Sequence, residues 1–136
     1  MTTQMTAQDV LELSKALQFF VERLIMARSK HGANLTPGQR AEAERYEGQI
    51  LDFASTLNAQ SLLTTLSMLD GELKVLKDCT AGIKEAAQRI ANIHKGIALA
   101  TKIAALGVEI SLAIASGNVV AMIAAGGAVL DAVSGA

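Results

Sequence analysis

Residues 97–136 read IALATKIAALGVEISLAIASGNVVAMIAAGGAVLDAVSGA. The charged residues of this stretch are Lys102, Glu109 and Asp131. Gly117 and Asn118 suit a tight reversal, so we expect one apolar helix over 97–115 and another over 119–133. A helix that is apolar on every side needs to be buried. Residues 97–136 therefore predict a hydrophobic helical hairpin that other helices, other subunits or lipid must cover.

The N-terminal part, residues 1–60, predicts an amphipathic helical hairpin. Over 7–30, apolar residues recur at three- and four-residue steps, which is typical of one buried helix face: Val10, Leu13, Leu17, Phe20 or Val21, and Leu24. The HGAN sequence then interrupts the pattern, and Gly32 suits a left-handed helix end.

A second helix is predicted to start after Thr36. Thr36 is a suitable N-cap, Pro37 fits the first helical position, and Gln39 completes a capping box. This helix is expected to run to about Leu57, with one apolar side formed by Tyr46, Ile50, Phe53 and Leu57. The carboxylates of Glu42, Glu44 and Glu47 are expected to form a solvated face.

Residues 61–96 predict one long helix with a heptad pattern. Steps of four and three residues connect Leu62, Leu66, Leu69, Leu73, Leu76, Thr80, Ile83, Ala87, Ile90, His94 and Ile97, the 3.5-residue spacing of a coiled-coil seam. His94 in this seam is a candidate pH switch, because a buried imidazole that gains charge near pH 6 would destabilise the packing. The simpler interpretation is a hydrogen-bonded or partly exposed histidine.

Length and composition indicate one all-α domain, an elongated helical bundle over residues 1–136. The net charge is −1 and aromatic residues make up 3% of the chain, which gives no basic patch and few rings for nucleic acid, so no nucleic-acid partner is expected. Cys79 is the sole cysteine, so no intramolecular disulfide can form. The first residues lack a basic region followed by an apolar run, so no signal peptide is predicted. We expect a cytoplasmic form, or release without a signal peptide.

The sequence contains no motif of a known catalytic or metal site. HExxH, CxxC and GxSxG are all absent. Cys79 is more simply interpreted as a small packed residue than as a nucleophile. We therefore expect no enzymatic activity, no cofactor and no metal.

The free energy of inserting the C-terminal hairpin into a membrane is close to zero or unfavourable. About eight large apolar residues in 97–115 each favour insertion by roughly 0.3–0.6 kcal/mol, whereas Lys102 and Glu109 each oppose it by about 2.5–3.5 kcal/mol. The second helix is shorter than the ~20 residues that span a bilayer. This balance predicts a segment that inserts only conditionally, or one that forms a buried core or subunit interface.

The residues expected to insert or to form an interface are the large apolar residues of both helices: Ile103, Leu106, Ile110, Leu112, Ile114, Val119, Val120, Met122, Ile123, Val129 and Leu130. Lys102 and Glu109 lie seven residues apart and so share a helix face. They are expected to form a polar stripe facing solvent, or to line a water-filled lumen in an assembly.

An amphipathic hairpin, a long seam helix (Leu62 to Ile97) and an apolar hairpin (Ile97 to Val133) together resemble the α-helical pore-forming toxins. This resemblance implies a membrane-active protein that oligomerises and inserts its C-terminal hairpin into a lipid membrane, with or without a second protein component. The alternative is a non-enzymatic oligomeric assembly or adaptor protein that uses the same hairpin as a protein–protein interface.

Overall fold

The computed structural model describes residues 2–31, 33, 35–61, 66–90 and 92–134. Over these residues the chain forms five helices and two short strands. In chain order they are β1 (Thr2–Met5), α1 (Ala7–His31), α2 (Pro37–Ser61), β2 (Leu66–Leu69), α3 (Asp70–Gln88), α4 (Ile93–Ser116) and α5 (Val119–Ser134). The predicted all-α class is confirmed.

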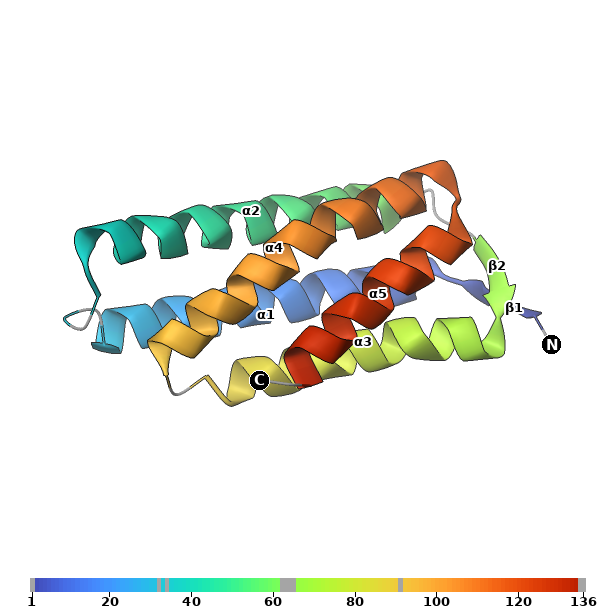
Figure 1. Ribbon diagram of the computed structural model, residues 1–136. Helices are drawn as coiled ribbons and strands as arrows, with labels where there is room; N and C mark the ends of the chain where they lie inside the picture. The colour runs from blue at the N-terminus through green and yellow to red at the C-terminus, as the bar shows by residue number, and fades with distance from the viewer. Residues whose placement is uncertain (1, 32, 34, 62–65, 91, 135–136) are drawn as a thin grey trace.

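The helices form an elongated bundle of two layers (Figure 1). The first layer contains α2, α1 and α3, with α1 in the middle. The second layer contains α4 and α5, which pack on each other; α4 packs on α2 and α5 packs on α3. Leu17, Phe20 and Leu24 of α1 are completely buried, so the core of the bundle is centred on α1.

The limits of α1 and the start of α2 agree with the helices predicted from the sequence, whereas α2 continues to Ser61, beyond the predicted end at about Leu57. At the start of α2, the Gln39 backbone N–H donates to Thr36 Oγ1 over 3.1 Å, and the Thr36 N–H donates to Gln39 Oε1 over 2.9 Å. This is the predicted capping box, which satisfies two N–H groups that the first helical turn leaves without partners. The predicted left-handed stop at Gly32 lies outside the described residues.

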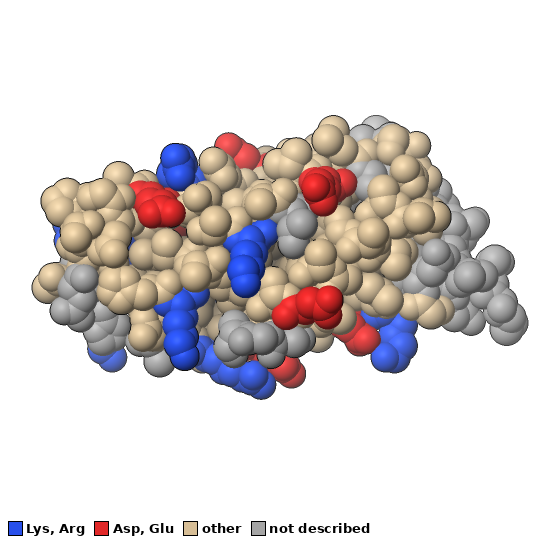
Figure 2. Space-filling model, in the orientation of Figure 1, with Lys and Arg blue, Asp and Glu red and all other residues tan. Residues whose placement is uncertain are grey.

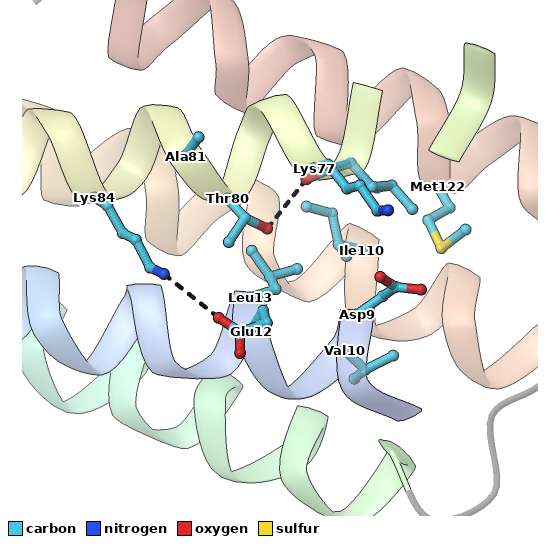
Figure 3. A pocket seen from close by; sticks show the side chains of 11 residues that line it. Asp9, Val10, Glu12, Leu13, Lys77, Thr80, Ala81, Lys84, Ile110 and Met122 are labelled. Carbon is cyan, nitrogen blue, oxygen red and sulfur yellow. Dashed lines mark hydrogen bonds and ion pairs between the residues drawn. The ribbon is translucent and has the colours of Figure 1, made fainter. Parts of the chain in front are cut away.

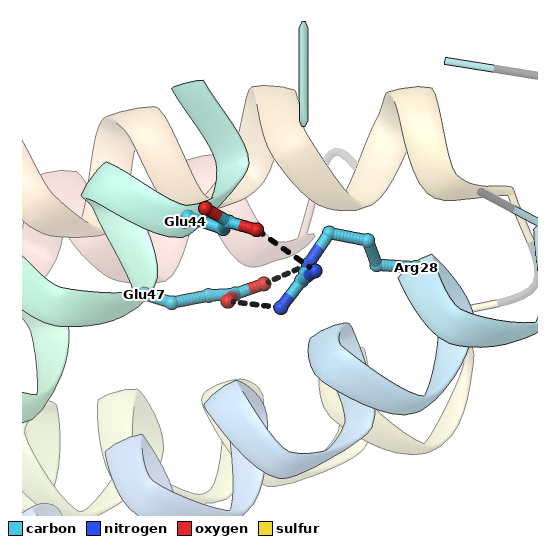
Figure 4. Close-up of polar contacts among 3 residues, drawn as sticks. All are labelled: Arg28, Glu44 and Glu47. Atoms are coloured by element: carbon cyan, nitrogen blue, oxygen red, sulfur yellow. Dashed lines mark hydrogen bonds and ion pairs between the residues drawn. The ribbon is translucent and has the colours of Figure 1, made fainter. Parts of the chain in front are cut away.

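An ion pair joins α1 to α2, and it corrects the prediction that Glu47 is solvated (Figure 4). Glu47 is only 5% exposed. Arg28 of α1 donates to both of its carboxylate oxygens, from Nε over 3.0 Å and from Nη2 over 2.9 Å, and reaches Glu44 from Nη1 over 3.3 Å. The hydrogen bonds to Glu47 are the main cause that raises the pKa of Arg28. The sequence pattern missed this pair because its two partners lie on different helices.

The prediction of one long helix over 61–96 is wrong. Helix α3 ends at Gln88 and α4 begins at Ile93. The physical reason is a local cap, because the Asn92 side chain accepts the backbone N–H groups of His94 over 2.9 Å and Lys95 over 3.4 Å. Asn is among the preferred N-cap residues, and this signal was available in the sequence.

The predicted seam region also contains a strand. β2 pairs antiparallel with β1, with Thr2 opposite Leu69 and Met5 opposite Leu66. The resulting two-stranded ribbon lies at one end of the bundle (Figure 1). Antiparallel backbone hydrogen bonds with a distant segment replaced helical ones here, a choice that heptad spacing alone does not predict.

The turn between α4 and α5 agrees with the prediction at Gly117 and Asn118. Gly117 has a φ angle of 72°, in the left-handed region that glycine adopts without a steric penalty. Asn118 then caps α5, because its Oδ1 accepts the Ala121 N–H over 3.1 Å.

Candidate functional site

The residues predicted for insertion or an interface are divided between the two sides of the α4–α5 layer. Those that face the first layer are buried: Ile103, Ile110, Met122 and Val129. Val119, Ile123 and Leu130 are partly buried against the same core. Leu112 and Val120 are exposed, at 64% and 77%. Leu106 and Ile114 lie on α4, but their side chains fall outside the description.

The inward side of α4 is fitted closely to α2. A Cβ atom at Gly107 would overlap the aromatic ring of Phe53 on α2, so only glycine allows this approach of the two helices. A polar contact lies nearby, where Gln60 Nε2 of α2 donates to the Ser111 carbonyl of α4 over 2.9 Å. These contacts hold the second layer of helices against the first.

The outward side of the layer forms the candidate site, which we name the outer face. It consists of these exposed residues of α4 and α5: Ala98, Lys102, Ala105, Val108, Glu109, Leu112, Val120, Ala121, Ala124, Ala128 and Asp131. Most are alanine or larger apolar residues. Small residues allow close approach of another helix, and an exposed apolar patch often marks an interaction site.

Exposed residues of α4 repeat at four- and three-residue steps along the outer face. The series is Ala98, Lys102, Ala105, Glu109 and Leu112. This 3.5-residue spacing is the one that keeps a stripe of side chains facing a partner helix. This stripe is separate from the heptad spacing predicted over residues 61–96, and its side chains are exposed.

The outer face contains charged residues of both signs. Within the described part of the chain, Lys102, Glu109 and Asp131 make no ion pair, whereas Arg28, Lys74, Lys84 and Arg89 all do. Lys102 and Asp131 line the same shallow groove between α4 and α5. Figure 2, with α4 and α5 toward the viewer, shows wide uncharged areas and a few separate charged side chains. The outer face thus has charges of both signs available for a partner.

His94 does not occupy a buried seam position. It is exposed in the first turn of α4. The burial that the predicted pH switch depended on is therefore absent.

The described residues can be compared with two requirements of catalytic sites, a reactive thiol and a cluster of metal ligands. Cys79 is buried on α3, and burial raises the pKa of its thiol to about 12, so the nucleophilic thiolate is scarce at neutral pH. Among the side chains that the structure describes, no group of His, Cys, Asp and Glu is placed to hold a metal ion.

A pocket between α1 and α3 was not foreseen from the sequence (Figure 3). Its lining includes Asp9 and Glu12 of α1, and Lys77 and Lys84 of α3. Ile110 and Met122, two residues predicted for insertion, contribute to its base. No sequence signal could have identified this pocket, because four helices form it.

Over the described residues, none of the helices has the length and apolar character required to cross a bilayer. Comparison with known proteins gives no match to a protein family, to a curated protein or to a solved structure.

Proposed function

We propose that the protein is a non-enzymatic assembly protein that associates with a second copy of itself through the outer face. The observation that carries this proposal is the pair Lys102 and Glu109, two exposed charges of opposite sign on one stripe of α4, neither with an ion-pair partner in the described chain. A surface with this arrangement complements its own copy.

The geometry of such a pair follows from helix dimensions. Positions 102 and 109 are separated by about 10.5 Å along α4, at 1.5 Å per residue. If α4 packs antiparallel on its copy, Lys102 of each subunit can lie opposite Glu109 of the other. The two-fold axis then passes beside Ala105, which is exposed and small. A two-fold interface uses the same patch on both subunits.

Apolar contacts and ion pairs have different roles in this interface. Exposed ion pairs contribute only about 0–1 kcal/mol each, so burial of the alanines, Leu112 and Val120 supplies most of the affinity. The two ion pairs favour the antiparallel orientation and disfavour other partners. Because the outer face has no identified catalytic group, assembly is its proposed role.

Sedimentation equilibrium of the full chain in detergent-free buffer tests the proposal. Lys102→Glu alone, or Glu109→Lys alone, places like charges opposite each other and should weaken dimerisation. The double variant Lys102→Glu/Glu109→Lys restores opposite charges and should recover it. Lys15→Glu, at an exposed site on α1, is the control. A monomer at all concentrations, or a double variant as weak as the singles, would contradict the proposal.

Membrane activity is the second candidate function. It is supported by the apolar character of 97–133 and by the break between α3, which ends at Gln88, and α4, which begins at Ile93. The close packing of Gly107 against the Phe53 ring opposes movement of α4 away from α2. Dye release from liposomes, at pH 7.5 and 5.5, tests it. Release that is abolished by Met122→Asp, with helix content kept, would favour membrane activity over assembly in solution.

A further inference from the structure

The pocket between α1 and α3 has the size and chemistry of a small-molecule site (Figure 3). Its volume is about 290 Å³, near the lower limit of the ~300–1,000 Å³ that is usual for ligand pockets. Side chains from α1, α3, α4 and α5 meet around it. It lies apart from the outer face, so a ligand here would be independent of the proposed dimer interface.

The interior of the pocket is apolar. Val10, Leu13, Leu76, Ile110 and Met122 line it and are all buried. The Thr80 hydroxyl also lines the pocket, but it donates to the Leu76 carbonyl over 3.1 Å. The lining therefore favours an apolar body in the ligand and provides little to hydrogen-bond it.

The charged groups at the rim differ in whether they already have partners. Lys84 Nζ lies 3.4 Å from Glu12 Oε2. Asp9 Oδ2 accepts the Thr6 N–H over 2.8 Å and the Thr6 hydroxyl over 3.1 Å, and Asp9 is also in the first turn of α1, where the helix dipole favours a negative charge. Lys77 is exposed and makes no ion pair within the described chain. Lys77 is thus the rim group that remains free to bind an opposite charge.

We infer that this pocket binds a medium-chain aliphatic carboxylate, with the chain among Leu13, Ile110 and Met122 and the carboxylate at Lys77. An aliphatic ammonium fits less well, because the rim carboxylates already accept protein donors. The small volume favours a medium chain over a long lipid chain. Each methylene buried in the pocket should strengthen binding about fourfold, until the space is filled.

Isothermal titration calorimetry of the full chain tests this inference with hexanoate, octanoate and decanoate. Affinity should rise about fourfold per methylene over the first members of the series. Octylamine has the same chain with the opposite charge and should bind more weakly than octanoate. Equal binding of octanoate and octylamine, or no dependence on chain length, would overturn the inference.

Two variant pairs locate the site. Lys77→Gln should weaken octanoate binding by up to about fivefold and leave octylamine binding no weaker, whereas Lys74→Gln, whose lysine pairs with Asp78 outside the pocket lining, should change neither. Thr80→Leu places extra volume in the pocket and should abolish binding, whereas Thr80→Val keeps the shape and should retain it. Circular dichroism checks that each variant is folded. Octanoate binding that survives Thr80→Leu would place the ligand elsewhere.

Discussion

The two layers of the bundle are stabilised in different ways. In the first layer, buried polar contacts join α1 to α2: Arg28 binds Glu47 through two hydrogen bonds, and the buried Ser14 hydroxyl donates to the Ala54 carbonyl over 2.9 Å. The second layer, α4 and α5, packs on the first mainly through apolar side chains, and α4 approaches α2 closely at Gly107. Hydrogen bonds and an ion pair fix how α1 and α2 align, whereas close packing of side chains against α2 positions α4.

The helices of the two layers also differ in composition, because α4 and α5 are more apolar than α1, α2 and α3. Arg28 of α1 and Lys74 and Lys84 of α3 have acidic partners, whereas Lys15 of α1, Lys77 of α3 and the three charges of the outer face make no ion pair among the described residues. A surface that is apolar and has unpaired charges is better matched to a partner than to water. In the proposed assembly, the first layer maintains the fold and the second layer presents the interface.

The largest effect on stability is expected at the centre of the first layer. Phe20→Ala removes a fully buried ring from α1 and should lower the free energy of unfolding by about 3–5 kcal/mol. Leu112→Ala on the outer face should change it by no more than ~0.5 kcal/mol, measured by urea unfolding at concentrations where the chain is monomeric. Similar losses of unfolding free energy in the two variants would contradict the idea that the first layer, and not the outer face, maintains the fold.

The next effect is expected at the ion pair between α1 and α2. Glu47→Ala leaves the guanidinium of Arg28 without its main partner and should cost about 3 kcal/mol of unfolding free energy. The matched control is Glu44→Ala, which removes the exposed carboxylate on the same arginine and should cost less than ~1 kcal/mol. Equal losses of unfolding free energy in the two variants, measured by urea unfolding, would show that the burial of Glu47 does not contribute to stability.

Glycine substitutions test whether the second layer needs the close approach of α4 to α2. Gly107→Ala forces a Cβ into the Phe53 ring and should destabilise the protein by about 1–2 kcal/mol, after allowance for the better helix propensity of alanine. Gly127→Ala on α5 meets nothing within 4 Å and should stabilise it by about 0.5–1 kcal/mol. Thermal unfolding of both variants measures the difference, and shifts of the same sign would refute a steric requirement at Gly107.

A change in stability at alkaline pH is expected at Cys79. Burial raises the pKa of its thiol from 9.0 to about 12. The unfolded chain therefore releases this proton near pH 9, while the folded chain keeps it until about pH 12, so stability is lost as the pH rises between these values. The thiol should contribute a decrease of about 1.4 kcal/mol per pH unit in this range.

The control for this prediction is Cys79→Ala. Other groups also titrate above pH 9, so the measurement is the difference in pH slope between the two proteins in urea unfolding from pH 8 to 10.5. Parallel slopes would show that the thiol is not shielded from solvent.

Local signals in the sequence predicted much of the helical structure. The capping box at Thr36 and Gln39 correctly placed the start of α2, and Gly117 correctly placed the turn between α4 and α5. The Asn92 cap is equally local, but the regular heptad spacing around it favoured an unbroken helix. The prediction over 61–96 was wrong because spacing shows which residues share a face only if the helix continues.

The candidate sites were less predictable. The sequence identified Lys102 and Glu109 as one stripe, because a seven-residue separation returns to the same helix face. It did not show which side of α4 packs on α2. It gave no indication of the pocket at Lys77, since residues far apart in the chain form its walls.

The sequence by itself determined the helical class, the limits of α1, the start of α2, and the apolar character of α4 and α5, because caps and periodicity act over a few residues. Only the tertiary structure decided the pairing of β1 with β2, the burial of Glu47 against Arg28, and which residues form the outer face. Each of these depends on contacts between segments distant in the chain, and such contacts depend on packing of the whole bundle, which local preferences do not specify.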